Sequence, residues 1–283
     1  MTWVAWRQQR LLTLVSLGLV AVVAAGMGAL WVDASAHSGR LADRYGGLLG
    51  YIPLVMLALP VLLGMFAGAP VFARDVEQGT HVFALTQSIG RTRWWATKLL
   101  VAGVPVTIAM TLLGLLNAKA LEPVGFLVSN RLQTPMFESQ GLVLGVYTAA
   151  AFALGATAGL LVRTTLGAMA ITLAGYLGLL VLVGNAARPR YATPLESTTP
   201  ELGAWNVGRD YVDARGQHVP FSYSGCATED VQACLADHGV VGQVLRYHPV
   251  SRFWDFQLIE SGLVVVVVVA LLGVGAWAVR RVH

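Results

Sequence analysis

The residues best suited to binding chemistry lie in a polar stretch between two long apolar ones. An acidic-x-acidic-x-Gly-Thr pattern forms its core, and the whole group comprises Arg74, Asp75, Glu77, Gln78, Gly79, Thr80 and Arg91. Apolar residues such as Phe72, Phe83 and Ile89 recur among them at roughly helical spacing. This pattern is typical of an amphipathic helix on a membrane surface. Its charged face either is solvated or contacts another protein, and the pattern alone leaves both interpretations open.

A second polar group leads into the last apolar stretch of the chain and consists of Phe253, Trp254, Gln257 and Glu260. Glu260 is either a carboxylate at a helix N-terminus in the headgroup layer or part of a gate at the outer membrane surface. We expect no ionised group near the middle of the membrane, which argues against a proton relay or an ion-coupled carrier.

The two cysteines of the chain, Cys226 and Cys234, lie close together in a long polar segment. A disulfide between them is expected if this segment faces an oxidising compartment. Free thiols and a metal site are the alternatives, but a structural zinc normally takes four ligands and only His218, His238 and His248 are nearby. We therefore predict no metal site.

The motifs of common enzymes are missing from the full sequence. It contains no H-E-x-x-H, no G-x-S-x-G and no P-loop pattern, and its two lysines, Lys98 and Lys119, do not follow a glycine. We therefore expect no catalytic residue here and no binding of ATP through a P-loop of this chain. A membrane enzyme that acts through Asp210, Asp213 and His218 is an alternative hypothesis.

Long apolar helices must position these groups. Of 283 residues, 56% are hydrophobic and 12% are charged, about half the charged share of soluble domains. Six apolar stretches can cross about 30 Å of hydrocarbon as helices, at about 11–32, 48–73, 99–118, 141–162, 165–186 and 260–279. The predicted fold is an all-α polytopic membrane protein, with one six-helix domain (1–187 and 258–283), an insert (74–98) and a cap (188–257).

The charges predict the orientation. Both termini share one side, where only Asp75 and Glu77 oppose nine cations, namely Arg7, Arg10, Arg74, Arg91, Arg93, Lys98, Arg163, Arg280 and Arg281. Cytoplasmic loops carry such an excess of Lys and Arg. We therefore expect the termini and the insert in the cytoplasm and the cap outside. Arginine dominates the basic residues, as in GC-rich bacterial genomes, so the expected location is a bacterial cell membrane.

Small residues in the fourth span predict close helix packing. Gly141 and Gly145 form one small-xxx-small pair, and Gly155 and Gly159 form another. Such pairs let another helix approach closely. The approaching helix belongs either to the same chain or to a second copy.

The insert resembles that of permease subunits of type-2 ATP-binding-cassette exporters. The resemblance rests on Asp75, Glu77, Gly79 and Thr80, followed by Thr86, Gln87, Ser88, Arg91 and Lys98, and on a tail that includes Pro249, Arg252 and residues 253–260. The six-span layout extends it over nearly the whole chain. It implies that the insert is a coupling helix, whose polar residues from Arg74 to Arg91 contact a separate P-loop ATPase holding ATP and Mg²⁺. It also implies a permease homodimer with two ATPase subunits.

The same resemblance implies outward transport of an amphipathic small molecule, peptide or lipid. The first, second and fifth spans line the path in that family, which suggests Met27, Met56, Tyr176 and Asn185 as path residues here. Residues 253–260 correspond to an outer re-entrant helix that shapes the exit. A membrane anchor or sensor that partners an ATPase without transport is the second alternative hypothesis.

Overall fold

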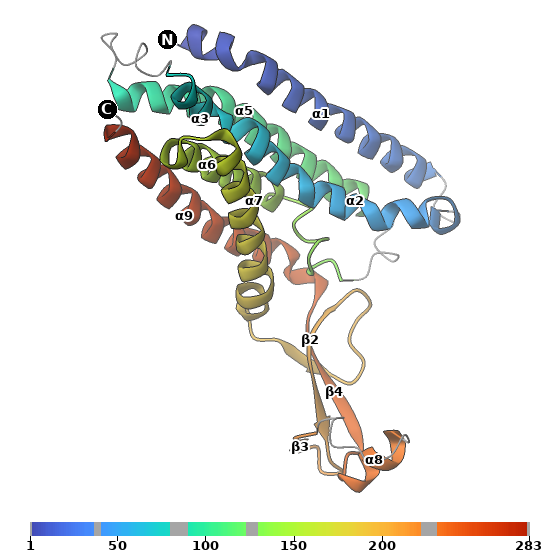
Figure 1. The fold of residues 1–283 in the computed structure, drawn as a ribbon. Coiled ribbons are helices and arrows are strands. Elements are labelled where there is room, and N and C mark those ends of the chain that lie inside the picture. Colours follow the sequence, from blue (N-terminus) through green and yellow to red (C-terminus); the bar gives the residue numbers. More distant parts are fainter. Residues whose placement is uncertain (1, 37–40, 80–89, 123–129, 222–230, 282–283) are drawn as a thin grey trace.

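The computed structural model describes residues 2–36, 41–79, 90–122, 130–221 and 231–281. Six of the described helical segments are long and apolar enough to span a membrane, as predicted: Gln9–Asp33, Gly50–Glu77, Arg91–Ala120, Val143–Val162, Thr165–Arg190 and Val250–Arg280. They form one bundle with both termini at the same end, and a small sheet projects from the opposite end (Figure 1). We call these ends the terminal end and the sheet end.

The bundle helices are α1 (Thr2–Ala36), α2 (Leu41–Leu63), α3 (Pro70–Glu77), α5 (Arg91–Ala120), α6 (Val143–Val162), α7 (Thr165–Val181) and α9 (Phe253–Arg280). Short irregular turns extend several of them. The π-helical turn η2 (Gly64–Gly68) joins α2 to α3, so that the second span continues to Glu77. The turns η4 (Leu182–Ala187) and η5 (Arg188–Arg190) extend α7, and η7 (Val250–Arg252) precedes α9.

Helix α6 is the most buried span because its small residues let its neighbours approach. A Cβ atom on Gly155 would lie 2.4 Å from the carbonyl oxygen of Gly64, and one on Gly159 would lie 2.6 Å from that of Ala69. A Cβ on Gly145 would collide with Thr111 of α5. These glycines therefore pack against helices of the same chain, which agrees with the intrachain alternative.

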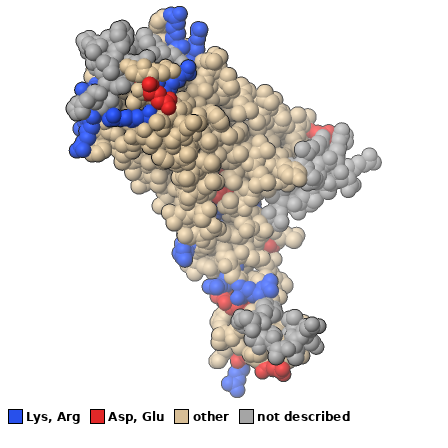
Figure 2. Space-filling view, in the orientation of Figure 1, with Lys and Arg blue, Asp and Glu red and all other residues tan. Residues whose placement is uncertain are grey.

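The outer surface of the bundle is apolar along most of its length. Leu11, Val22, Leu112, Leu166 and Val266 are each more than half exposed, as expected for side chains that face lipid. Figure 2 shows Lys and Arg side chains gathered at the two ends of the molecule, with a wide band of few charged residues between them.

The sheet end carries four antiparallel strands in the order β1-β4-β2-β3, comprising β1 (Leu195–Ser197), β2 (Trp205–Val212), β3 (His218–Val219) and β4 (Gly242–His248). The short helix α8 (Val231–Asp237) precedes β4. Strand β1 follows the fifth span and β4 leads back into the sixth, and the antiparallel pair β2–β4 forms the long centre of the sheet (Figure 1). Pairing of Trp205 with His248 places the base of this strand pair against the bundle.

Candidate functional site

At the terminal end, a buried ion pair joins the second and third spans. Lys98 of α5 donates from Nζ to the carboxylate of Asp75 in α3 and, at 3.4 Å, to the carbonyl oxygen of Val71. Lys98 is only 4% exposed, and its Nζ lies 5.2 Å from the centre of the Trp94 ring. Asp75, predicted to contact a partner protein, therefore has a structural role within this chain.

Glu77 caps the start of α7. Its Oε1 accepts a hydrogen bond from the backbone N–H of Thr165 (2.8 Å), and its Oε2 accepts one from Thr165 Oγ1 (2.5 Å). The unpaired N–H groups and the dipole at a helix start favour a carboxylate there. Arg91 makes a similar connection between helices, since its Nη1 donates a hydrogen bond to the carbonyl oxygen of Arg280 at the end of α9 (3.0 Å). Glu77 and Arg91 thus connect the ends of neighbouring spans.

The other residues predicted to contact an ATPase lie at the surface beside residues 80–89. Arg74, Gln78 and Gly79 are exposed, and Gly79 has a φ of +69°, which ends the helix and turns the chain. Thr80 lies outside the described residues. A partner contact stays a prediction for this whole group.

The structure differs from the sequence expectation at Phe72. Helical spacing places Phe72 on the apolar side of a surface helix, but this residue is fully buried, with its ring 5.2 Å from that of Trp94. The reason is that α3 continues the second span and packs within the bundle. Residues 80–89, which make up much of the predicted amphipathic helix, lie outside the described residues, so that helix stays a prediction.

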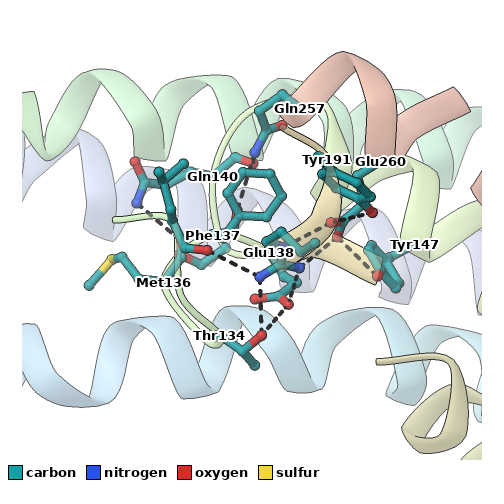
Figure 3. Close-up of polar contacts among 12 residues, drawn as sticks. Thr134, Met136, Phe137, Glu138, Gln140, Tyr147, Tyr191, Gln257 and Glu260 are labelled. Carbon is teal, nitrogen blue, oxygen red and sulfur yellow. Dashed lines mark hydrogen bonds and ion pairs between the residues drawn. The ribbon is translucent and has the colours of Figure 1, made fainter. Parts of the chain in front are cut away.

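At the sheet end, three charged side chains meet inside the bundle (Figure 3). Arg188 of η5 donates from Nη2 to Glu138 Oε1 (2.6 Å) and to Glu260 Oε1 (2.7 Å), and from Nε to Glu260 Oε2 (2.8 Å). Each of these three residues is at most 1% exposed. We call Glu138, Arg188 and Glu260 the charge cluster.

The two carboxyl groups of the charge cluster are not equally satisfied. Glu260 also accepts hydrogen bonds from the hydroxyl groups of Tyr147 (3.0 Å) and Tyr191 (3.1 Å), so that both its oxygens have two donors. Glu138 Oε1 accepts from Thr134 Oγ1 (2.6 Å) and Arg188, whereas its buried Oε2 has no hydrogen-bond partner in the described part of the chain.

Charge balance in the charge cluster favours one neutral carboxyl group. One guanidinium faces two carboxyls, so the cluster would hold one excess negative charge if both were ionised. A buried unpaired charge costs several kcal/mol, and a carboxyl group avoids this cost by binding a proton.

A buried irregular segment surrounds the charge cluster. Residues 130–142 form successive turns ahead of α6, and Gln257 of α9 holds them. Its Nε2 donates to the carbonyl oxygens of Phe137 (3.3 Å) and Gln140 (3.1 Å), and its Oε1 accepts from the backbone N–H of Val143 (3.0 Å). Non-helical backbone at the depth of a bundle requires such partners. Leu132, Phe137 and Glu138 of this segment are buried, although they lie in the connection between the third and fourth spans.

Side chains at the edge of this region have altered pKa values. Burial raises the pKa of Tyr191, and the charge of Glu260 raises it further. Burial also lowers the pKa of Arg131, whose Nε donates to Gln140 Oε1 at 2.8 Å. The pKa of His248 is lowered, first by burial and then by Arg252, while its bond to the Pro189 carbonyl opposes this shift.

The charge cluster was not predicted from the sequence. Glu260 was assigned to the headgroup layer or to a gate; its side chain is fully buried within the bundle, and both assignments stay predictions. Arg188 and Glu260 both lie within spanning segments, toward the sheet end, and the expectation of no ionised group near the middle of the membrane stays a prediction. One pattern could have indicated the pair. A basic residue at the end of the fifth span and an acidic residue near the start of the sixth lie on the same side in any six-span topology.

The remaining residues predicted for the gate and path lie in different environments. Phe253 is 2% exposed and Trp254 is 49% exposed. Met27, Met56 and Tyr176 are buried within one copy of the chain, and Asn185 is exposed. Their predicted roles in a substrate path or gate stay predictions.

The cap offers no assembled catalytic site among its described residues. Asp210 pairs with Arg246 (2.9 Å), and Asp213 Oδ1 accepts from the backbone N–H groups of Arg215 and Gln217 in the β2–β3 turn. No group of three or more metal-ligating side chains occurs in the part of the chain that is described. Cys234 is buried, and Cys226 lies outside the described residues, so the disulfide stays a prediction.

The fold and these two regions define a polytopic helical membrane protein whose spans are joined at both ends by polar contacts. The family model described as ABC-2 membrane transporter related matches residues 2–188, and the chain belongs to this family. It is therefore a transmembrane component of a transporter. No curated protein and no solved structure matches the chain. The family match ends at Arg188, so β1–β4 and α9 lie beyond it.

Proposed function

We propose that this chain is the permease subunit of an ATP-binding-cassette exporter and moves an amphipathic molecule outward across a bacterial cell membrane. A separate P-loop ATPase supplies the energy, and two copies of each subunit form the working complex. The chain itself catalyses no reaction, and ATP and Mg²⁺ bind on the ATPase.

The observation that carries this proposal is the lack of a P-loop pattern in a member of the ABC-2 transporter family. A transporter of this kind needs an ATPase on another polypeptide. The terminal end is the docking surface that we propose for it, because the exposed residues Arg74, Gln78 and Gly79 adjoin the connection between the second and third spans there.

The docking surface is tested by a bulky substitution at an exposed residue. Gln78→Trp should weaken co-purification of the ATPase subunit, because a large ring would obstruct a closely packed contact. Gln243→Trp, an exposed glutamine of β4 at the sheet end, is the matched control and should leave assembly unchanged. Equal ATPase recovery with both variants would reject docking at the terminal end.

The orientation is tested by single cysteines at Gln78 and Thr198 in a background without the native cysteines. Both positions are exposed, one near each end. An impermeant thiol reagent should label Thr198→Cys but not Gln78→Cys in intact cells. The reverse pattern would overturn the cytoplasmic placement of the termini.

Transport and sensing are separated by ATP hydrolysis measured on the co-purified complex in vesicles. An exporter should couple ATP hydrolysis to movement of the stimulating compound across the bilayer. Stimulation without movement would favour the anchor or sensor hypothesis.

A further inference from the structure

A cavity at the terminal end lies between α1, η2, α3, α5 and α7, and has a volume of about 370 Å³. Its wall is apolar toward the lipid side, where Leu11, Val15 and Phe66 are each more than half exposed. Its deep side is polar and includes Gln9 of α1 and the buried Asp75–Lys98 pair. An apolar wall next to a polar recess matches an amphipathic molecule that enters from the bilayer.

Gln9 is the feature of this cavity that the fold does not explain. The residue is only 7% exposed, yet neither its Nε2 nor its Oε1 has a hydrogen-bond partner among the described residues. An unsatisfied buried amide costs about 1–3 kcal/mol, so a group that both accepts and donates hydrogen bonds would be favoured beside it.

The charges of the cavity indicate the kind of head group. Lys98 and Asp75 neutralise one another, and the guanidinium of Arg74 at the rim makes no hydrogen bond or ion pair with another described residue. This leaves one positive charge at the mouth. Basic pockets between spanning helices bind anionic lipid head groups.

We propose that this cavity binds a phospholipid of the bilayer with a phosphate and a hydroxyl group in its head, such as phosphatidylglycerol. Its phosphate accepts hydrogen bonds from Arg74 and from Gln9 Nε2. A glycerol hydroxyl donates to Gln9 Oε1, and the acyl chains lie along Leu11, Val15 and Phe66. This site does not depend on the direction of transport, although Arg74 at its mouth also belongs to the surface that we propose for the ATPase.

Native mass spectrometry of the full chain, released from nanodiscs of phosphatidylcholine with a minor share of phosphatidylglycerol, tests the site. The parent should retain phosphatidylglycerol preferentially. Gln9→Leu and Arg74→Gln should each lower its retention by about fivefold, the size expected for one lost hydrogen bond. Arg93→Gln is the matched control, because Arg93 is an exposed arginine at the same end but does not line the cavity.

A photoactivatable phosphatidylglycerol should crosslink to peptides that contain Phe66 or Met169 in the parent and not in Gln9→Leu. Arg74→Gln is a surface substitution, so it keeps the test informative if Gln9→Leu does not fold. If Arg93→Gln lost as much phosphatidylglycerol as Arg74→Gln, general surface charge would explain the retention. That result would overturn the site. No preference for phosphatidylglycerol in the parent, or crosslinks only elsewhere, would also overturn it.

Discussion

Polar contacts connect neighbouring spans at both ends of the bundle, but the contacts at the two ends differ in burial. At the terminal end, the largely buried Asp75–Lys98 pair and the exposed Glu77–Thr165 contact join neighbouring spans. At the sheet end, the charge cluster joins the fifth and sixth spans to segment 130–142 by contacts that are fully buried. The polar contacts of the sheet end are therefore more deeply buried than those of the terminal end.

Burial explains why the two ends should respond differently to mutation. Water replaces the lost partner of an exposed charge, so an exposed ion pair contributes little. No water replaces the partner of a buried charge, so removing one member leaves the others unpaired at a cost of about 3–5 kcal/mol.

The largest effect is expected for Arg188→Ala. This change leaves Glu138 and Glu260 buried without their cation, and we expect the free energy of unfolding to fall by about 3–5 kcal/mol. Thermal and denaturant unfolding of the purified protein in detergent measure it. Arg190→Ala is the control, because Arg190 is an exposed arginine of the same turn. A loss below about 1 kcal/mol for Arg188→Ala would contradict a stabilising role for the charge cluster.

The two carboxyl groups of the charge cluster provide the second comparison. Glu260→Gln removes the negative charge that four donors share, and should cost about 2–3 kcal/mol. Glu138→Gln should cost less than about 1 kcal/mol, because one oxygen of Glu138 has no hydrogen-bond partner in the described part of the chain and Glu260 still pairs with Arg188. The same unfolding measurement ranks the two variants. The opposite order would show that Arg188 depends more on Glu138 than on Glu260.

Much of the fold could be predicted from sequence because each span is a local pattern. An uncharged stretch of sufficient length specifies a spanning helix whatever the rest of the chain does. The charge cluster could not be predicted in the same way. Its three residues come from segments 50 and 72 positions apart and meet only after the spans pack. The role of Glu77 could not be predicted either, because Glu77 accepts hydrogen bonds from Thr165 only if α7 begins at that residue.

Substitution of Asp75 should have an intermediate effect on the free energy of unfolding. Asp75→Asn removes the counter-charge of Lys98, whose side chain is 5% exposed, and we expect a loss of about 1–2 kcal/mol in unfolding free energy. Asp210→Asn in β2 is the matched control, since its partner Arg246 is 45% exposed and the pair should contribute less than about 1 kcal/mol. Equal losses in the two variants would remove the distinction between buried and exposed pairs.

The smallest expected effect is a pH dependence at the joint between the cap and the bundle. His248 is buried between the Trp205 and Phe256 rings. Arg252 Nη1 lies 3.1 Å from His248 Nδ1 and can only donate, so the neutral ring presents its Nε2–H to the carbonyl oxygen of Pro189 (3.1 Å). Protonation of Nδ1 would place a second positive charge against Arg252.

Because the pKa of His248 is lower in the folded than in the unfolded state, the unfolded state binds more protons as the pH falls. The stability that His248 contributes is therefore complete above about pH 6.5, the usual pKa of the unfolded side chain, and declines below it. The melting temperature of the parent should fall more between pH 7 and pH 5 than that of His248→Gln, which cannot titrate. An unchanged pH dependence in His248→Gln would show that the joint does not respond to protonation, and the sheet end would then be insensitive to pH at this position.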